Sequence, residues 1–314
     1  MSINFSYEAF RYFSNNTKVL IIFVPIAIGM KFKKHNRNQN LEKTSTFKRS
    51  DERSKDDVKA KKHLGQHFLT DLSIAKQIAD ALTLHKNYQH VVEIGPGMGV
   101  LTQFLKDNPH FTLYPIDIDF DSITYLKKHF PTLEKNFIYG DFLAMDLDLI
   151  TNNNPFAVIG NFPYNISTQI LFKVLDFKDK VPEVVGMFQK EVAERVAAPP
   201  GSKVYGITSV LLQAFYNVEY LFTVNENVFN PPPKVKSGVI RLTRNSVEQL
   251  NCNESFFKTV VKTSFNQRRK TLRNSLRPFL TEDTIELEIF NLRPEQLSVE
   301  QFITITNLLE PTKS

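Results

Sequence analysis

The sequence predicts an α/β protein with a Rossmann-like, mainly parallel sheet, helices on both faces and a small C-terminal helical domain. Three observations support this fold class. Short continuous apolar runs, such as Phe156–Gly160, are typical of strands buried on both faces of a parallel sheet. A glycine-rich turn, Gly95-Pro-Gly-Met-Gly99, joins another apolar run to a helix-like stretch. Single polar residues, Asp117, Asp141 and Asn161, stand where further runs end.

The first predicted strand covers Val91–Ile94 and leads through the glycine turn into a predicted helix that starts at Val100. Glycines at a strand-to-helix turn let the backbone pass close to a ligand, and the first N–H groups of the helix face that ligand. The spacing is G-x-G-x-G, which differs from the dinucleotide pattern G-x-G-x-x-G and from the phosphate loop G-x-x-x-x-G-K. The turn alone therefore indicates a ligand site and leaves the choice of cofactor open.

The next two predicted strands narrow this choice. The run Phe111–Ile116 ends in Asp117, where an acid can accept hydrogen bonds from ribose hydroxyls. The run Phe137–Gly140 ends in Asp141, which is placed to accept a hydrogen bond from an adenine amine. Because ligands bind at the carboxyl ends of the strands in an open sheet, the glycine turn and the two acids together fit a bound S-adenosylmethionine.

The tetrapeptide Asn161-Phe-Pro-Tyr164 follows the predicted strand Phe156–Gly160 and suits chemistry on an aromatic amine. The exocyclic nitrogen of adenine is a poor nucleophile because its lone pair is delocalised into the ring. The Asn161 side-chain carbonyl and a nearby backbone carbonyl can each accept one N–H of this amine, which frees the lone pair for attack. Pro163 fixes φ and holds the carbonyl before it, and Tyr164 offers a face on which an extruded base can stack. For the motif alone, an Asx-type turn that closes a strand is the alternative.

These motifs belong to an ordered set that resembles the KsgA-type ribosomal RNA adenine dimethyltransferases from about Lys61 to Leu309. The set comprises Lys62–Leu69, Glu93–Gly97, Gly140-Asp141, Asn161–Thr168, Gln189–Arg195, Pro200–Gly206, Phe229–Ser237, Gln267–Leu276 and Pro294–Ser298. The resemblance implies a class I S-adenosylmethionine-dependent methyltransferase fold. It also implies the reaction, which is dimethylation of the exocyclic amine of two adjacent adenines near the 3′ end of small-subunit (16S) ribosomal RNA in ribosome biogenesis.

The resemblance also implies roles for single residues. Those expected to line the S-adenosylmethionine site are His67, Leu69, Gly95, Gly97, Asp117, Asp141 and Asn161. The catalytic residues that face the target adenine are expected to be Asn161, Phe162 and Tyr164. Phe229 is expected to stack on the target base together with Tyr164.

Three of these positions depart from the usual family pattern. Asp117 stands where Glu is usual, and its side chain is one methylene shorter, which leaves the ribose contact the weakest of the set. Phe162 stands where Leu is common, but the backbone carbonyl is the group that matters there. His67 stands where Asn is common, and either residue can bond a carboxylate or an amide.

The predicted helical domain covers residues 246–314 and follows a catalytic domain of residues 61–245. Between Phe256 and Arg277 there are seven basic residues and no acidic ones. Five of them run beside apolar residues at helical spacing and form what we call the cationic stripe, Lys258, Lys262, Arg269, Arg273 and Arg277. The stripe is expected to contact RNA phosphates, with a solvated helix face as the alternative. The apolar residues beside the stripe drift around the helix too far for one straight helix, which predicts a break near Asn266-Gln267. Further on, Ser298-Val-Glu-Gln301 has the spacing of a capping box and predicts a last helix through Leu309.

Residues 1–60 differ from the rest of the chain. The apolar run Val19–Met30 is shorter than the ~20 residues that are needed to cross a bilayer. A charged, asparagine-rich stretch follows and is predicted to be a flexible linker. We interpret residues 1–60 as a disordered extension without a function of its own, and a signal or membrane tether is the alternative.

The composition agrees with a cytoplasmic enzyme that acts on RNA. The net charge of +6 suits a polyanionic partner. The single cysteine, Cys252, excludes an internal disulfide and is compatible with a reducing compartment. The cysteine and the histidines lack metal-ligand spacing, so no metal is expected. We expect a monomer without a stable protein partner and without membrane association, which binds small-subunit ribosomal RNA or its assembling particle.

Two other functions fit parts of the sequence. A large-subunit ribosomal RNA adenine methyltransferase of the macrolide-resistance type shares the core chemistry and a similar tetrapeptide, but Pro200–Gly206 and Gln267–Ser275 favour the small-subunit enzymes. A non-catalytic RNA-binding assembly factor could use the same fold. The presence of all donor-site residues together with Asn161 and Tyr164 argues against it.

Overall fold

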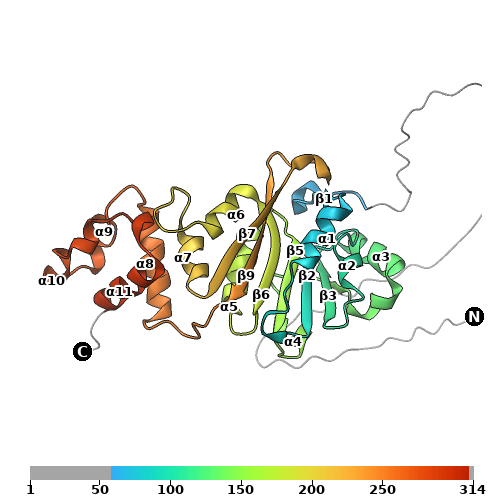
Figure 1. Cartoon of the computed structure of the whole chain (residues 1–314), viewed down its shortest axis with the longest axis horizontal. Coiled ribbons are helices and arrows are strands. Elements are labelled where there is room, and N and C mark those ends of the chain that lie inside the picture. The colour runs from blue at the N-terminus through green and yellow to red at the C-terminus, as the bar shows by residue number, and fades with distance from the viewer. Residues whose placement is uncertain (1–57, 311–314) are drawn as a thin grey trace, which may run out of the picture. The chain divides into compact units, whose positions relative to one another are not determined.

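The computed structural model of the chain describes residues 58–310, which all lie in one compact unit, Glu52–Ser314. A sheet of seven strands forms its centre, in the order β4-β3-β2-β5-β6-β9-β7 (Figure 1). The strands are β2 (His90–Ile94), β3 (Thr112–Asp117), β4 (Ile138–Tyr139), β5 (Phe156–Asn161), β6 (Glu183–Gln189), β7 (Tyr216–Val224) and β9 (Ser237–Arg244). The first five in chain order are mutually parallel, whereas β9 runs antiparallel to both β6 and β7. The predicted mainly parallel α/β sheet is confirmed.

Alternate residues of each central strand enter two different hydrophobic cores, because successive side chains of a strand point to opposite faces. In β2, Val91 belongs to one core and Val92 to the other. Helices α1 (Leu72–Asp80), α2 (Thr102–Leu105) and α3 (Phe120–His129) contribute to the core with Val91. Helices α4 (Leu147–Thr151), α5 (Ser167–Asp176), α6 (Lys190–Ala197) and α7 (Ile207–Gln213) contribute to the core with Val92.

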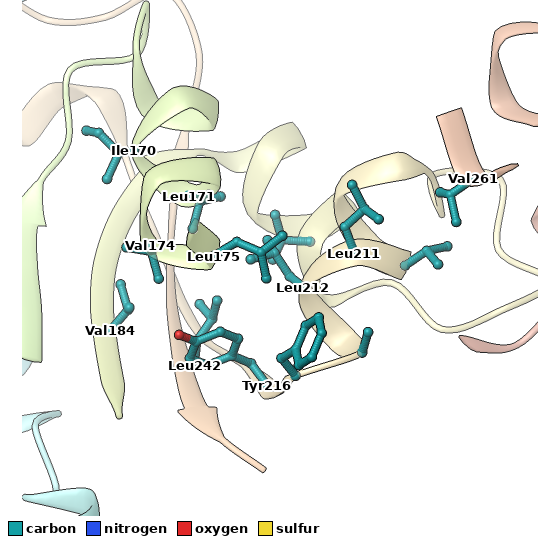
Figure 2. Packing of buried hydrophobic residues seen from close by; sticks show 14 of the residues in the cluster. Ile170, Leu171, Val174, Leu175, Val184, Leu211, Leu212, Tyr216, Leu242 and Val261 are labelled. Atoms are coloured by element: carbon teal, nitrogen blue, oxygen red, sulfur yellow. The ribbon is translucent and has the colours of Figure 1, made fainter. Parts of the chain in front are cut away.

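The apolar runs of the sequence fall on these strands because both faces of the sheet are covered. Phe156, Val158 and Ile159 of β5 are completely buried, and β5 lies between β2 and β6. Figure 2 shows the packing on one face, where side chains of α5, such as Ile170 and Val174, lie near the strand residue Val184.

A separate two-stranded ribbon lies outside the main sheet. Strand β1 (Phe68–Leu69) pairs antiparallel with β8 (Phe229–Asn230), so that Leu69 stands opposite Phe229. The ribbon therefore joins the segment before α1 to the segment before β9, although more than 150 residues separate them in the chain.

C-terminal helices continue the core that contains Val92. Those that do so are α8 (Glu254–Asn266), α9 (Leu272–Ser275) and α11 (Val299–Leu309). The short helix α10 (Glu282–Ile285) has no buried residue. Buried side chains of α7 and α8, including Leu211 and Val261, belong to the same core as the sheet (Figure 2). The predicted domain boundary after residue 245 stays a prediction, since one continuous core spans it.

Two predictions about these helices are confirmed. Helix α8 ends at Asn266, at the predicted break. Helix α11 starts with the predicted capping box, in which the Gln301 main-chain N–H donates to the Ser298 hydroxyl at 3.3 Å and the Ser298 N–H donates to the Gln301 side chain at 2.9 Å. The interpretation of residues 1–60 as an extension falls outside the described residues, apart from its last three positions.

Candidate active site

A cavity opens at the carboxyl ends of β2, β3, β4 and β5, where the sequence placed its polar residues. The lining comprises residues 64–68, Ile94, Gly95, Gly97, residues 116–118, residues 140–143 and residues 161–166. Parallel strands bring their carboxyl ends to one edge of the sheet, which explains why residues far apart in sequence meet here. Six of the seven residues predicted to bind the cofactor line this cavity, and Leu69 is the exception.

All three glycines of the turn after β2, including Gly99, have conformations that side chains rarely adopt. Gly95 has φ +65° and Gly97 has φ +57°, which is the left-handed region. A Cβ atom on Gly97 would also lie 2.8 Å from Cε1 of Phe68. The turn therefore requires glycine, and its backbone forms one wall of the cavity.

Asp117 is buried at the end of β3 and is held by main-chain donors. Its carboxylate accepts hydrogen bonds from the Gly97 N–H at 3.2 Å and the Asp119 N–H at 2.8 Å. Burial raises the pKa of this carboxyl to about 6 in spite of these bonds. A carboxylate has room for further donors such as ribose hydroxyls. Asp141 is exposed at the cavity and accepts the Leu143 N–H at 2.8 Å, which leaves its second oxygen for a ligand.

Asn161 is oriented by a bond to the segment before β1. Its Nδ2 donates to the main-chain oxygen of His67 at 2.8 Å. Because the amide nitrogen is used in this way, the amide oxygen Oδ1 is the group that can accept a hydrogen bond from a substrate in the cavity. His67 is held in turn, since its Nδ1 lies 2.8 Å from the oxygen of Pro231.

The side chain of Tyr164 is held through its hydroxyl and through its ring. Its hydroxyl lies 2.5 Å from the hydroxyl of the buried Ser237 on β9. Its ring stacks on His67 with the centroids 5.6 Å apart. Since His67 covers one face of the ring, an extruded base would have to use the opposite face or the ring edge.

Two predicted site residues are not brought to the cavity. Phe229 is only 4 % exposed, and Leu69 is 3 % exposed. Both belong to the core on the side of α1 to α3, because the pairing of β1 with β8 turns them toward that core. The expectation that Phe229 stacks on the target base stays a prediction, and the structure places this side chain in the core. Leu69 lines a neighbouring cavity together with Gly95 and Asn161.

Several lining residues were not singled out from the sequence. Ile118 directly follows Asp117 and is 49 % exposed although it is apolar, so it offers an apolar wall beside the acid. Phe142 and Leu143 do the same after Asp141. A large apolar residue directly after each strand-end acid is the sequence signal that could have identified them.

A buried acid that was not predicted from the sequence lines the neighbouring cavity. Glu93 of β2 is 1 % exposed, and one of its oxygens accepts the Thr102 hydroxyl at 2.7 Å. Burial raises the pKa of this carboxyl to about 8.

The cationic stripe does not line the cavity, and its members differ in their surroundings. Lys258 lies 3.6 Å from a carboxylate oxygen of Asp176, and Arg273 lies 3.7 Å from one of Glu286. The other three, Lys262, Arg269 and Arg277, are exposed. The predicted RNA contacts of the stripe stay a prediction.

Two features are absent from residues 58–310. This part of the chain contains no cluster of three or more histidine, cysteine or acidic side chains that could hold a metal ion. None of the helices in the same range is long and apolar enough to cross a membrane.

Comparisons with solved structures agree with the fold. One solved structure, a dimethyladenosine transferase from Plasmodium falciparum, has 26 % sequence identity and a TM-score of 0.64, and the match covers 78 % of this chain and 97 % of that one. The 23S ribosomal RNA methyltransferase ErmE has 23 % identity and a TM-score of 0.58, with 78 % and 100 % covered, which supports the fold alone. The predicted class I methyltransferase fold is confirmed.

Comparisons with curated sequences give higher identities than those with solved structures. A protein of Cytophaga hutchinsonii named ribosomal RNA small subunit methyltransferase A is 62 % identical over 254 residues, which are 80 % of this chain and 98 % of that protein. A protein of the same name from Phocaeicola vulgatus is 58 % identical over 257 residues, or 81 % and 90 %. The sequence model of the family described as ribosomal RNA adenine dimethylase matches residues 57–310. The chain therefore belongs to the ribosomal RNA adenine dimethylase family.

Proposed function

We propose that this enzyme transfers methyl groups from S-adenosylmethionine to the exocyclic amines of two adjacent adenines near the 3′ end of small-subunit ribosomal RNA. The observation that carries the proposal is the orientation of Asn161. Its amide nitrogen is bound to the His67 carbonyl, which leaves the amide oxygen as an acceptor at a cavity that also holds Asp117 and Asp141.

The cofactor would be held by the backbone of Gly95 and Gly97, by Asp117 at the ribose and by Asp141 at the adenine ring. S-adenosylmethionine supplies a methyl group that is already activated by the positive sulfur. The apolar residues Ile118 and Phe142 would pack against the cofactor and exclude water. The fit rests on the left-handed glycines and on the two acids that the sheet brings to one edge.

The residues of the tetrapeptide would act on the target adenine. Asn161 Oδ1 and the main-chain oxygen of Phe162 each accept one N–H of the amine. Both acceptors are fixed dipoles, so they stabilise the positive charge that develops on the nitrogen as it is methylated. The amine becomes more acidic during this step and can lose its proton to water. A monomethylated amine offers only one N–H, so the second transfer has a different geometry from the first.

RNA would be guided to the cavity by exposed basic side chains. Lys262, Arg269 and Arg277 are exposed, and the net charge of +6 favours a polyanion. We propose further that the enzyme works as a monomer in the cytoplasm, where the small ribosomal subunit is assembled.

A direct test uses labelled S-adenosylmethionine with unmethylated small subunits and, in parallel, with large subunits. Label in small-subunit RNA alone is the expected result. Label in large-subunit RNA would instead favour an enzyme of the macrolide-resistance type. Binding of small subunits without label in either RNA would favour a non-catalytic assembly factor.

A further inference from the structure

The ring of Phe162 lies over a gap between two neighbouring strands. Gly160 of β5 and Gly186 of β6 stand opposite each other in the parallel register. A Cβ atom on Gly160 would lie 2.7 Å from Cε1 of Phe162, and one on Gly186 would lie 2.4 Å from its Cε2. The two edges of one ring therefore rest on two glycines, one on each strand. We call this pair of glycines the glycine slot.

The remaining contacts of the ring are also well defined. Phe162 is 1 % exposed. The ring of Phe188, two residues after Gly186, packs edge-on against it with the centroids 5.0 Å apart and the planes at 79°. The Phe162 main-chain N–H donates to the oxygen of Met187 at 3.1 Å. The residue is thus held to β6 by its backbone and by its ring at the same time.

The slot explains how a large aromatic ring can occupy the second position of the tetrapeptide. A side chain at either glycine would displace the ring. Because the ring is buried and packed against Phe188, we expect part of this displacement to pass to the backbone of Phe162 and to its two peptide groups. These peptide groups carry the Asn161 side chain on one side and the Phe162 carbonyl on the other. The two proposed acceptors for the amine therefore depend on an empty space that lies beneath them.

We infer that Gly160 and Gly186 are positioning residues for methyl transfer, because they seat the Phe162 ring and thereby fix the two acceptors. This inference rests on the proposed function and names two residues outside the lining of the cavity. The glycines act through Phe162, so their effect should fall on kcat. Binding of the cofactor should not change.

The test is a double-mutant cycle of Gly186→Ala and Phe162→Leu, measured as kcat for methyl transfer to unmethylated small subunits. Gly186→Ala should lower kcat by about a hundredfold, which is the effect of a misplacement near 1 Å. Cofactor affinity from calorimetric titration should stay within about twofold of the parent. Phe162→Leu alone should lower kcat less, because leucine fits the slot loosely. The double variant should be more active than Gly186→Ala, because the smaller side chain makes room for the new methyl group and lets Phe188 shift.

Gly160→Ala is the matched control. Its Cβ would lie 2.6 Å from the main-chain oxygen of Ile94 as well as against Phe162, so Phe162→Leu should not rescue it. Full activity of Gly186→Ala, or strictly multiplicative effects in the cycle, would overturn the inference. Lower activity of the double variant than of Gly186→Ala alone would also overturn it.

If Gly186→Ala folds poorly, the single variant Phe162→Leu still tests the inference. It should lower kcat while the cofactor affinity stays unchanged. A parental kcat in Phe162→Leu would refute the positioning role of the two glycines. An inactive parent enzyme would instead refute the proposed function itself, so the two failures can be told apart.

Discussion

The side-chain Nδ2 of Asn161 lies 2.8 Å from the main-chain oxygen of His67. This bond ties the carboxyl end of β5 to the segment before β1 and decides which end of the amide faces the cavity. The segment with His67 is itself held by Pro231 at 2.8 Å. Orientation of the proposed acceptor thus depends on contacts between three parts of the chain that are far apart in sequence.

Replacement of Asn161 by alanine should lower the rate of methyl transfer by about a hundredfold or more, since one fixed dipole at the reacting nitrogen is lost. RNA affinity should change little. The matched control is Asn136→Ala, because the Asn136 side chain also donates to a main-chain oxygen, that of Leu113 at 3.0 Å, but lies outside the cavity lining. A rate near that of the parent for Asn161→Ala would show that the proposed role is wrong.

Replacement of Asp141 by asparagine should weaken binding of S-adenosylmethionine about tenfold or more, because an acceptor for the adenine amine becomes in part a donor. Asp146→Asn is the control, since Asp146 accepts the N–H of Asp148 at 3.0 Å in a similar local turn, outside the cavity lining. Calorimetric titration measures both affinities. Equal affinity of the two variants would remove Asp141 from the site.

The buried carboxyl of Glu93 should make stability depend on pH. Burial raises its pKa from the ordinary value of 4.5 to about 8. The folded protein therefore holds the proton more tightly than the unfolded chain. The resulting stabilisation is fully present below pH 4.5 and is lost as the pH rises through about 8. Each unit of pKa difference corresponds to about 1.4 kcal/mol.

Glu93→Gln removes this dependence, because the amide oxygen can still accept the Thr102 hydroxyl but cannot ionise. The melting temperature of the variant, measured without cofactor and expressed relative to the parent, should rise between pH 4.5 and about 8. A difference that stays constant over this range would mean that Glu93 is ionised throughout.

The cationic stripe should contribute salt-dependent affinity for RNA. Joint replacement of Lys262, Arg269 and Arg277 by glutamine should weaken binding, and each lost phosphate contact should reduce the slope of log affinity against log salt by about 0.7 to 0.9. A control with the same change of charge replaces Lys86, Lys127 and Lys135, which are also exposed. An identical slope for the two triple variants would show that only net charge matters.

The positions of the acids and of Asn161 could be predicted because they depend on one local rule. Each stands at the end of a buried parallel strand, and the carboxyl ends of such strands meet at one edge. The helix break at Asn266 was equally accessible, since the drift of the apolar pattern is a property of the local sequence. These features need no knowledge of distant contacts.

The positions of Phe229 and Leu69 could not be predicted for the opposite reason. Both lie in strands of two residues, too short to show a period, and their burial follows from a pairing between distant segments. The ion pairs of Lys258 and Arg273 have the same origin, because Asp176 and Glu286 come from other elements. The glycine slot likewise becomes visible only when Gly160 and Gly186 are placed in register.

The most direct test of the central claim is to map the methylated bases. Unmethylated small subunits are incubated with the enzyme and S-adenosylmethionine, and their RNA is digested and analysed by mass spectrometry, with Asn161→Ala in parallel. We predict two adjacent N6,N6-dimethyladenosines near the 3′ end with the parent and almost none with the variant. Absence of dimethyladenosine with the parent, or an equal yield with Asn161→Ala, would contradict the account.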